Sequence, residues 1–235
     1  MFSASAEFYD LIYSSFKDYP AESAQIAALI RGLNPDARSI LDAACGTAEH
    51  ARLLVENHGF EVDGLDLDEA FVRIAQTKLS AGTVYHGDIT SFALPKRYDV
   101  VLCLFSAIGY VRTVSNVVRT LQCFGNHLTN HGVVIVEPWF PPGMLEPGRV
   151  FVKTGEGEGV SVCRMSHLTV EGAISRLRFE YLIGRPGGIE RASEIHELGL
   201  FTQEEMLGAF REAGLVPTYD PKGLMDRGLY VAHKS

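Results

Sequence analysis

The segment 42–47, Asp-Ala-Ala-Cys-Gly-Thr, holds the residues best suited to ligand chemistry in this 235-residue sequence. It follows a short apolar run, and its small residues let the backbone turn sharply. Gly46 can adopt backbone angles that other residues avoid, so a ligand can approach the main chain there, and the helix expected next presents unpaired N–H groups to it. Asp66, twenty residues after Gly46, closes a second apolar run. An acid at this spacing is suited to hold the two hydroxyls of an adenosine ribose, so the pair predicts a nucleoside-cofactor site.

Four expected strand ends carry polar or small residues. Asp42 opens the turn after the first strand, Asp66 ends the second, Asp88 follows the third, and the segment 104–106 follows the fourth. Ligands of open parallel sheets bind at the carboxyl ends of the strands. A dehydrogenase fingerprint would require G-x-G-x-x-G after the first strand, whereas Gly46 is the only glycine in that turn. One glycine suits a ligand with no pyrophosphate to cradle, which disfavours a dinucleotide.

The elements that must position these residues follow from apolar periodicity. Expected helices cover 20–33, 48–58, 68–80 and 114–128, and expected strands cover 39–43, 61–66, 83–86, 99–104 and 133–137. This order is typical of a parallel sheet with covering helices. An aromatic segment, 4–19, precedes the first strand and forms either a cap on the core or a lid over the ligand.

From about Arg149 the pattern changes to alternation. The runs 160–170, 174–183 and 189–200 predict antiparallel strands with one solvated face, and the Gly/Glu segment 155–159 is expected to be a mobile loop. Thr202 and Glu205 form a capping box for a helix that ends at Gly214, and a closing hairpin is expected to rejoin the main sheet. The predicted class is α/β, a doubly wound Rossmann-like sheet over 1–148 and 200–235, with an inserted antiparallel β lobe over 149–199.

The composition of the chain argues against several classes of function. The chain is 46% hydrophobic with a net charge of −8 and no Lys/Arg cluster, which argues against nucleic acid or an anionic membrane as partner. The longest apolar run, 100–108, is too short to span a bilayer, and the first residues show no signal-peptide pattern. Four dispersed cysteines lack metal-ligand spacing. We therefore expect a cytoplasmic protein with free thiols and no metal.

Three of the strand ends match known motifs. The sequence resembles the class I S-adenosylmethionine-dependent methyltransferases, with 41–47 matching their first motif, 64–66 the second and 87–89 the third. Within this class it is most similar to the N,N-dimethyltransferases of nucleotide-linked amino sugars, of the desosamine and mycaminose type. The narrower match rests on the segments 9–13, 17–19, 104–110, 137–140, 166–167 and 227–230. Members of the family have glycine where this chain has Ala48, and a methyl group there is expected to crowd the methionine end of the cofactor.

The resemblance implies S-adenosyl-L-methionine as the cofactor. In that arrangement Asp66 accepts from the ribose hydroxyls, Asp88 accepts from the adenine amino group, and Asp42 holds the ammonium group directly or through water. Each of these acids could instead only stabilise a turn or cap a helix. The other expected contacts are small, apolar or aromatic: Leu67 and Ile89 on the adenine, Ala44 and Gly46 beside the methionine portion, Leu104 at the fourth strand end, and Tyr13 and Tyr19 closing over the cofactor.

The same resemblance implies an amine acceptor, which must lose a proton before it attacks the methyl group. A neighbouring carboxylate or imidazole can help with that step. The candidate catalytic residues are Glu137 at the end of a core strand, His167 and His196 on strands expected to roof the pocket, and Tyr13. Each histidine could equally be a solvated or packed strand residue.

For the acceptor itself, Tyr110 and Trp139 are expected to form walls against a sugar. Arg227 is expected to bind a diphosphate through two parallel hydrogen bonds, the alternative being an exposed turn charge. The expected partner is a small-molecule methyl acceptor, with a sugar nucleotide as the leading candidate and a homodimer as the candidate assembly. Another small amine, hydroxyl or carboxylate acceptor remains open, as does a non-catalytic S-adenosyl ligand-binding protein.

Overall fold

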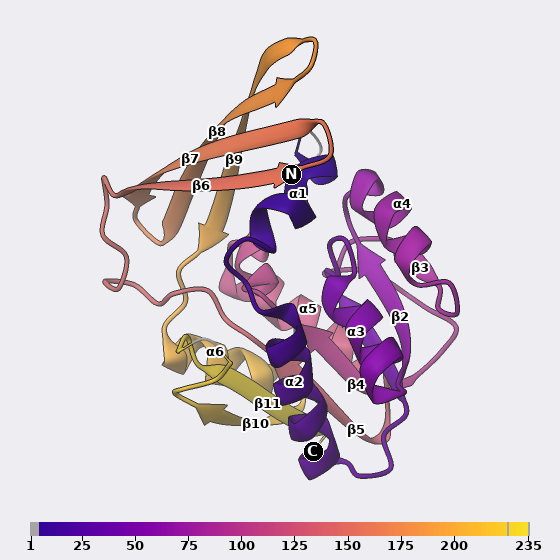
Figure 1. Ribbon diagram of the computed structural model, residues 1–235. Helices are drawn as coiled ribbons and strands as arrows, with labels where there is room; N and C mark the ends of the chain where they lie inside the picture. Colours follow the sequence, from indigo (N-terminus) through magenta and orange to yellow (C-terminus); the bar gives the residue numbers. More distant parts are fainter. Residues whose placement is uncertain (1–4, 225, 235) are drawn as a thin grey trace.

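The computed structural model describes residues 5–224 and 226–234. Its main sheet has seven strands in the order β10-β11-β5-β4-β1-β2-β3 (Figure 1). The strands of this sheet are β1 (Ser39–Ala43), β2 (Glu61–Asp66), β3 (Val84–His86), β4 (Tyr98–Cys103), β5 (Leu128–Val136), β10 (Leu215–Asp220) and β11 (Leu229–Lys234). The strands β1 to β5 run parallel, and β11 pairs antiparallel with β5 and β10. The predicted doubly wound α/β class is confirmed, including the closing hairpin that rejoins the sheet.

Helices cover both faces of this sheet. They are α1 (Ala6–Tyr13), α2 (Tyr19–Leu33), α3 (Glu49–His58), α4 (Glu69–Lys78), the 3-10 helix η1 (Ala107–Val111), α5 (Val114–Asn126) and α6 (Gln203–Glu212). The apolar sides of α2, α3 and α4 pack on one face, for example through Ile30 and Leu54. Those of α5 and α6 pack on the other, through Phe124 and Phe210. The chain therefore buries both faces of the parallel strands, as their unalternating apolar composition requires.

Local sequence sets where the helices begin. The Asp18 side chain accepts from the Ala21 N–H and caps α2, which has proline in its first turn. The Asp68 side chain accepts from the Ala70 N–H and caps α4. The predicted capping box of Thr202 and Glu205 is present at the start of α6. These caps fix the helix starts at the edge of the sheet where the ligand-suited turns lie.

Residues 150–199 form a second sheet, which we call the lobe. Its four antiparallel strands, in the order β6-β7-β8-β9, are β6 (Val150–Gly157), β7 (Val160–Glu171), β8 (Ile174–Arg185) and β9 (Gly188–Gly199). Its inner face packs on α1, where Phe8 and Ile12 meet Val162, Phe179 and Tyr181. Figure 1 shows α1 lying between the lobe and the rest of the chain. The amino-terminal helix thus joins the two sheets.

Two sequence expectations were wrong. The Gly/Glu segment is not a loop throughout, because its first three residues belong to β6. A Cβ on Gly155 would lie 2.7 Å from the Leu11 carbonyl oxygen, so glycine there permits close contact with α1 rather than mobility. Leu128, expected to continue α5, instead begins β5 beside Tyr98. The Leu128 side chain is buried in the core between the sheet and the helices α5 and α6.

Three features concern the described residues as a whole. No helix among them has the length and apolar character needed to cross a membrane. No group of three or more His, Cys, Asp or Glu side chains in the same residues is arranged to hold a metal ion. All four cysteines are free thiols.

Replacing Gly155 with Ala is expected to lower the free energy of unfolding by about 1–3 kcal/mol, because the added methyl group overlaps the backbone of α1. Gly184→Ala is the matched control, since a Cβ on this glycine of β8 meets only the Ser161 carbonyl oxygen at 3.6 Å. The control should change stability by less than about 0.5 kcal/mol. Urea unfolding of both variants measures the difference, and equal effects would contradict the close packing of β6 on α1.

Candidate active site

A cleft of about 620 Å³ opens at the carboxyl ends of β1 to β4 and extends under the inner face of the lobe. The register of the sheet brings the first strand ends together, with Asp42 beside Gly64 of β2 on one side and Leu102 of β4 on the other. Gly46, Asp66 and Asp88 all line this one cleft. The topology therefore gathers the ligand-suited turns, as predicted for an open parallel sheet.

Asp66 holds the turn after β1 in place. Its carboxylate accepts from the Gly46 N–H at 2.8 Å and from the Asp68 N–H at 2.9 Å. Burial raises the pKa of Asp66 above its ordinary value, and these two backbone hydrogen bonds oppose the shift. Asp66, at the end of β2, thus has two roles. Its carboxylate fixes the backbone of the turn after β1, and the same side chain lines the cleft.

The turn itself contains three residues in the left-handed region: Ala44, Gly46 and Ala48 have φ values of 62°, 56° and 61°. Such angles cost an alanine conformational energy that glycine does not incur. Ala48 is fully buried among the core residues of α2 and α3 and does not line the cleft. The expected crowding of the cofactor by its methyl group is therefore wrong. Glycine suits this position because of its backbone angle.

Acidic side chains line the half of the cleft formed by the strand ends: Asp42, Glu49, Asp66, Asp68 and Asp88. Asp42 is 3% exposed, and burial raises its pKa to about 6, with a smaller contribution from Asp66. Leu67, Ile89, Ala44 and Leu104 line the same half, as predicted. This part of the cleft offers carboxylate acceptors beside apolar and main-chain surface.

Aromatic residues of α1 and the start of α2 form one wall. Tyr13 and Tyr19 line the cleft as predicted, and Tyr9 lines it as well. The Tyr13 ring packs edge-on against Phe105 at 5.4 Å between centroids. The Lys17 ammonium lies over the Phe105 ring at 3.6 Å and pairs with a carboxylate of α2. This packing fixes the aromatic wall against the end of β4.

Basic side chains line the opposite half of the cleft: Arg112, Lys153, Arg164 and Arg227. Among the described residues that line this half there is no carboxylate. Arg164 of β7 is 7% exposed, and its guanidinium lies over the rings of Tyr13 and Phe179. Its Nε and Nη1 atoms have no hydrogen-bond acceptor among the described residues. A buried cation with donors left over is costly without an anion, so this half is built for a negatively charged ligand.

The chain is similar to known methyltransferases in both sequence and structure. Residues 40–132 match the family model described as a methyltransferase domain. The chain is 40% identical over 227 residues to a dTDP-3-amino-3,6-dideoxy-alpha-D-glucopyranose N,N-dimethyltransferase of Streptomyces fradiae, covering 96% of this chain and 89% of that protein. The crystal structure of Streptomyces venezuelae DesVI superposes with a TM-score of 0.91 at 36% identity, over 98% of both chains. The structure of SAM-bound CalS10, an amino pentose methyltransferase from Micromonospora echinaspora, gives a TM-score of 0.83 at 33% identity, over 94% of this chain and 93% of that one.

The chain belongs to the S-adenosylmethionine-dependent methyltransferases. The resemblance stated from the three motifs is confirmed, and S-adenosyl-L-methionine is the cofactor of the enzyme. This excludes the dinucleotide-dependent dehydrogenase that the single-glycine turn had already disfavoured.

Three of the expected catalytic residues of the methyltransferase, Glu137, His167 and His196, do not line its cleft. Glu137 is 2% exposed, and its carboxylate accepts from the Phe105 N–H at 2.6 Å and from the Arg227 guanidinium at 3.1 Å. The expectation that it holds the amine is wrong, because it neutralises a buried cation instead. His167 lies on the exposed face of β7, since Arg164 and Ser166 occupy the inward positions of that strand. The expectation that it roofs the cleft is also wrong.

The remaining predicted residues lie at the cleft or directly behind it. Tyr110, Trp139 and Arg227 line it. His196 is 1% exposed and does not line it, but its Nδ1 lies 3.1 Å from the Tyr110 hydroxyl. Sequence reasoning missed the inward residues of the lobe, namely Lys153, Arg164, Ser166 and Phe179. The available signal was that Arg164 shares the inward period of Val162 and Leu168, where a cation is unusual.

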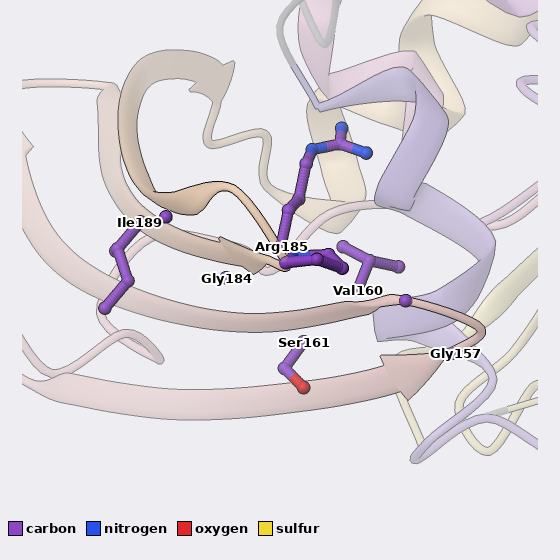
Figure 2. A pocket seen from close by; sticks show the side chains of 9 residues that line it. Gly157, Val160, Ser161, Gly184, Arg185 and Ile189 are labelled. Carbon is purple, nitrogen blue, oxygen red and sulfur yellow. The ribbon is translucent and has the colours of Figure 1, made fainter.

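A second depression lies at the tips of the lobe hairpins and is lined by four glycines and five other residues (Figure 2). Arg185, its one charged lining residue, points away from Ser161 in Figure 2 and forms an ion pair with Glu7 at 2.6 Å. This depression offers little chemistry, so the cleft is the candidate active site.

Replacing Asp42 with Asn is expected to stabilise the ligand-free protein by about 3 kcal/mol at pH 8 and by only about 1 kcal/mol at pH 4.5. The folded state binds the proton of this carboxyl more tightly than the unfolded chain, because its pKa is about 6 rather than about 3.9. Wild-type stability therefore falls through this group as pH rises from 4 to 6, and an amide has no such cost. Urea unfolding at the two pH values measures this. An equal gain at both, or no gain at pH 8, would show that Asp42 is not the buried acid described.

Proposed function

We propose that this methyltransferase transfers two methyl groups to the amino group of a dTDP-linked amino sugar. The observation that carries the proposal is the division of charge within one cleft, with carboxylates at the strand ends and, under the lobe, the buried Arg164 guanidinium, two of whose donors have no acceptor among the described residues. The relatives support it, because the Streptomyces fradiae protein is named as an N,N-dimethyltransferase of such a sugar nucleotide.

The acidic half fits the cofactor, whose sulfonium supplies an electrophilic methyl group when bound. An adenosine carries two ribose hydroxyls and an amino group as donors, and a methionine carries an ammonium, so carboxylate acceptors are the matching set. In our assignment Asp66 accepts from the ribose hydroxyls and Asp88 from the adenine amino group. Asp42 faces the ammonium, which stabilises the ionised carboxylate and opposes the effect of burial on its pKa.

Apolar and aromatic residues complete the cofactor site in this proposal. Leu67 and Ile89 contact the adenine, and Leu67 has an exposed side chain available for that contact. The main chain at Ala44 and Gly46, with Leu104, borders the methionine portion. Tyr13 and Tyr19 close the wall and exclude water from the reacting atoms.

The basic half fits a nucleoside diphosphate. Arg164 has two N–H donors without acceptors, and a guanidinium binds phosphate oxygens through parallel hydrogen bonds. Arg227 lines the same half and is held by Ser106 and Glu137, both at 3.1 Å. Its predicted contact with the diphosphate is retained here, with Arg164 as the second and less satisfied cation. A neutral or cationic acceptor would leave the Arg164 guanidinium without an anion.

The sugar then lies between the two halves, against the rings of Trp139 and Tyr110. The Trp139 indole N–H donates to the Ser175 hydroxyl at 2.8 Å, which fixes the ring. An in-line displacement depends on alignment of the nucleophile with the methyl group, and fixed walls of this kind can contribute roughly 7–11 kcal/mol through positioning. In this division, residues 1–148 and 200–235 form the cofactor-binding domain, which also contributes Tyr110, Trp139 and Arg227 to the acceptor site, and 149–199 is the insertion on the acceptor side.

The proposal extends to assembly and location. Val152, Met165, Leu182 and Ile195 are exposed on the lobe, and their strand register places them on its outer face. An apolar surface of this kind suits a second copy of the chain. Light scattering should then give twice the 25.8 kDa chain mass, and a monomer would exclude the dimer. Four free thiols suit the reducing cytoplasm.

The reaction is tested by mass spectrometry with S-adenosyl-L-methionine and dTDP-linked 3-amino and 4-amino sugars. We expect the mass of one acceptor to rise by one and then two methylene units, while the same amino sugar without its nucleotide is methylated poorly. Methylation of the free sugar as fast as of its nucleotide would contradict the proposal. Cofactor binding without methylation of any amine, hydroxyl or carboxylate acceptor would favour a non-catalytic binding protein.

Replacing Arg164 with Gln is expected to raise the KM for the sugar nucleotide by at least about tenfold, because charged hydrogen bonds of this type contribute about 1.5–3 kcal/mol. The KM for S-adenosyl-L-methionine should stay within about threefold. Arg178→Gln is the matched control, since Arg178 lies on the neighbouring strand of the lobe, is exposed, and pairs with Glu180. Steady-state kinetics of both variants measure the difference, and an unchanged acceptor KM in the Arg164 variant would remove the diphosphate site.

A further inference from the structure

A chain of hydrogen bonds leads from the cleft into the lobe. Tyr110 of η1 lines the cleft, and its hydroxyl lies 3.1 Å from Nδ1 of His196. The other ring nitrogen, Nε2, lies 3.3 Å from the Glu194 carboxylate. His196 and Glu194 are two residues apart on β9, so both face inward. The sequence gave no indication of these hydrogen bonds, because Tyr110 and His196 are 86 residues apart.

The surroundings of Glu194 determine the direction of these bonds. Its carboxylate also accepts from the N–H and hydroxyl of Ser5, at 3.0 and 2.9 Å, and from the Tyr181 hydroxyl at 3.1 Å. Burial alone would raise the pKa of Glu194, but the hydrogen bonds from His196, Ser5 and Tyr181 lower it below its ordinary value. An ionised carboxylate requires a proton on Nε2 of the imidazole. The Nδ1 lone pair of a neutral His196 then accepts from the Tyr110 hydroxyl.

Burial favours the neutral form of the His196 ring before the reaction. Burial lowers the pKa of His196, the hydrogen bond with Glu194 opposes that shift, and Arg164 adds to it. Tyr110 is bonded to its Nδ1, and Tyr181 is bonded to the same carboxylate. A neutral imidazole beside an ionised carboxylate can accept a proton at Nδ1, and the carboxylate stabilises the imidazolium that forms. Serine hydrolases use the same order of hydroxyl, imidazole and carboxylate.

We propose that Tyr110, His196 and Glu194 form a proton relay that deprotonates the acceptor amine before each methyl transfer. The Tyr110 oxygen takes the proton from the ammonium as its own proton passes to Nδ1 of His196. One N–H bond and one O–H bond break, while a new O–H bond and an Nδ1–H bond form. Tyr110 is the catalytic residue, and His196 and Glu194 act through it. The proton returns to water by the reverse path when the product has left. The relay rests on the proposed amine acceptor, which must lose a proton for each methyl group it receives.

Tyr110→Phe is the primary test, because it removes one hydroxyl from a residue that is 40% exposed and should leave the fold intact. A positioned proton acceptor contributes typically about 10²–10⁴-fold. We expect kcat at neutral pH to fall by at least about 100-fold, with both KM values within about threefold. The loss should shrink at high pH, where the acceptor amine deprotonates without help. A residue that only shaped the sugar site would instead raise the acceptor KM at every pH.

His196→Gln and the double variant test the coupling. Gln can hydrogen-bond to Tyr110 but cannot take its proton, so kcat should fall to the level of Tyr110→Phe. The double variant should then be no slower than either single variant, because all three interrupt one path. Multiplicative losses would contradict a relay. Tyr98→Phe is the matched control, since it removes a hydroxyl that donates to the Asp63 carboxylate at 2.9 Å outside the cleft, and its kcat should be unchanged.

A measurement without turnover gives an independent result. Long-range ¹H–¹⁵N correlation of the ligand-free protein should show His196 as the neutral form protonated at Nε2, with the Nδ1 signal shifted in Tyr110→Phe. Protonation of His196 at Nδ1 would overturn the relay. If the wild type methylates the amine and Tyr110→Phe is equally fast, the relay alone fails. If the wild type methylates no amine, the proposed function fails.

Discussion

The hydrogen bond from the Gly46 N–H to the Asp66 carboxylate joins the ends of β1 and β2, and the cleft depends on it. The turn after β1 has several left-handed residues, which the surrounding structure must hold in place. Asp66 does so from the neighbouring strand and also fixes the start of the next turn through the Asp68 N–H. The side chain assigned to the ribose is therefore also the one that shapes the main chain around the methionine portion.

A second constraint is the separation of charge across the cleft. The strand ends contribute carboxylates and the lobe contributes guanidinium and ammonium groups. In a partly desolvated space these groups interact more strongly than at the surface. Such a division fits the proposed pairing of a cationic methyl donor with an anionic nucleotide. It also explains how a chain with net charge −8 can present a basic site.

The lobe completes this site and cannot be separated from it. Its inner face supplies Arg164, Phe179 and the His196–Glu194 pair, while α1 packs against that face through Phe8 and Ile12. Tyr13 of the same helix borders the cofactor half. Movement of α1 would therefore disturb both halves of the cleft. Contacts of this kind favour coupled binding of the two substrates.

The sequence could place those polar residues whose position follows directly from the order of the strands. Asp66 and Asp88 could be placed because each ends or follows a strand, and parallel strands end at one edge. Position at a strand end does not determine which way a side chain points, which is why Glu137 was assigned to the cleft and found behind it. The prediction for His167 was wrong for a related reason. Alternation of polar and apolar residues divides a strand into two faces but does not say which face is buried.

Other features need three-dimensional contacts to be seen. Gly155 has the composition of a flexible loop, but its lack of a side chain is required by the carbonyl oxygen of Leu11. Arg164 and the Tyr110–His196 contact join elements that are distant in the chain. No local pattern encodes such pairs, because the two partners lie far apart in the sequence.

Titration of S-adenosylhomocysteine into wild type and Asp66→Asn by calorimetry tests the central interaction most directly. Asn keeps an oxygen for the Gly46 N–H but loses the charge and one acceptor for the ribose hydroxyls. We expect the affinity to fall by at least about tenfold, while Asp99→Asn, at the opposite end of the sheet, binds as the wild type does. Equal affinity of Asp66→Asn and wild type would show that this carboxylate does not hold the cofactor.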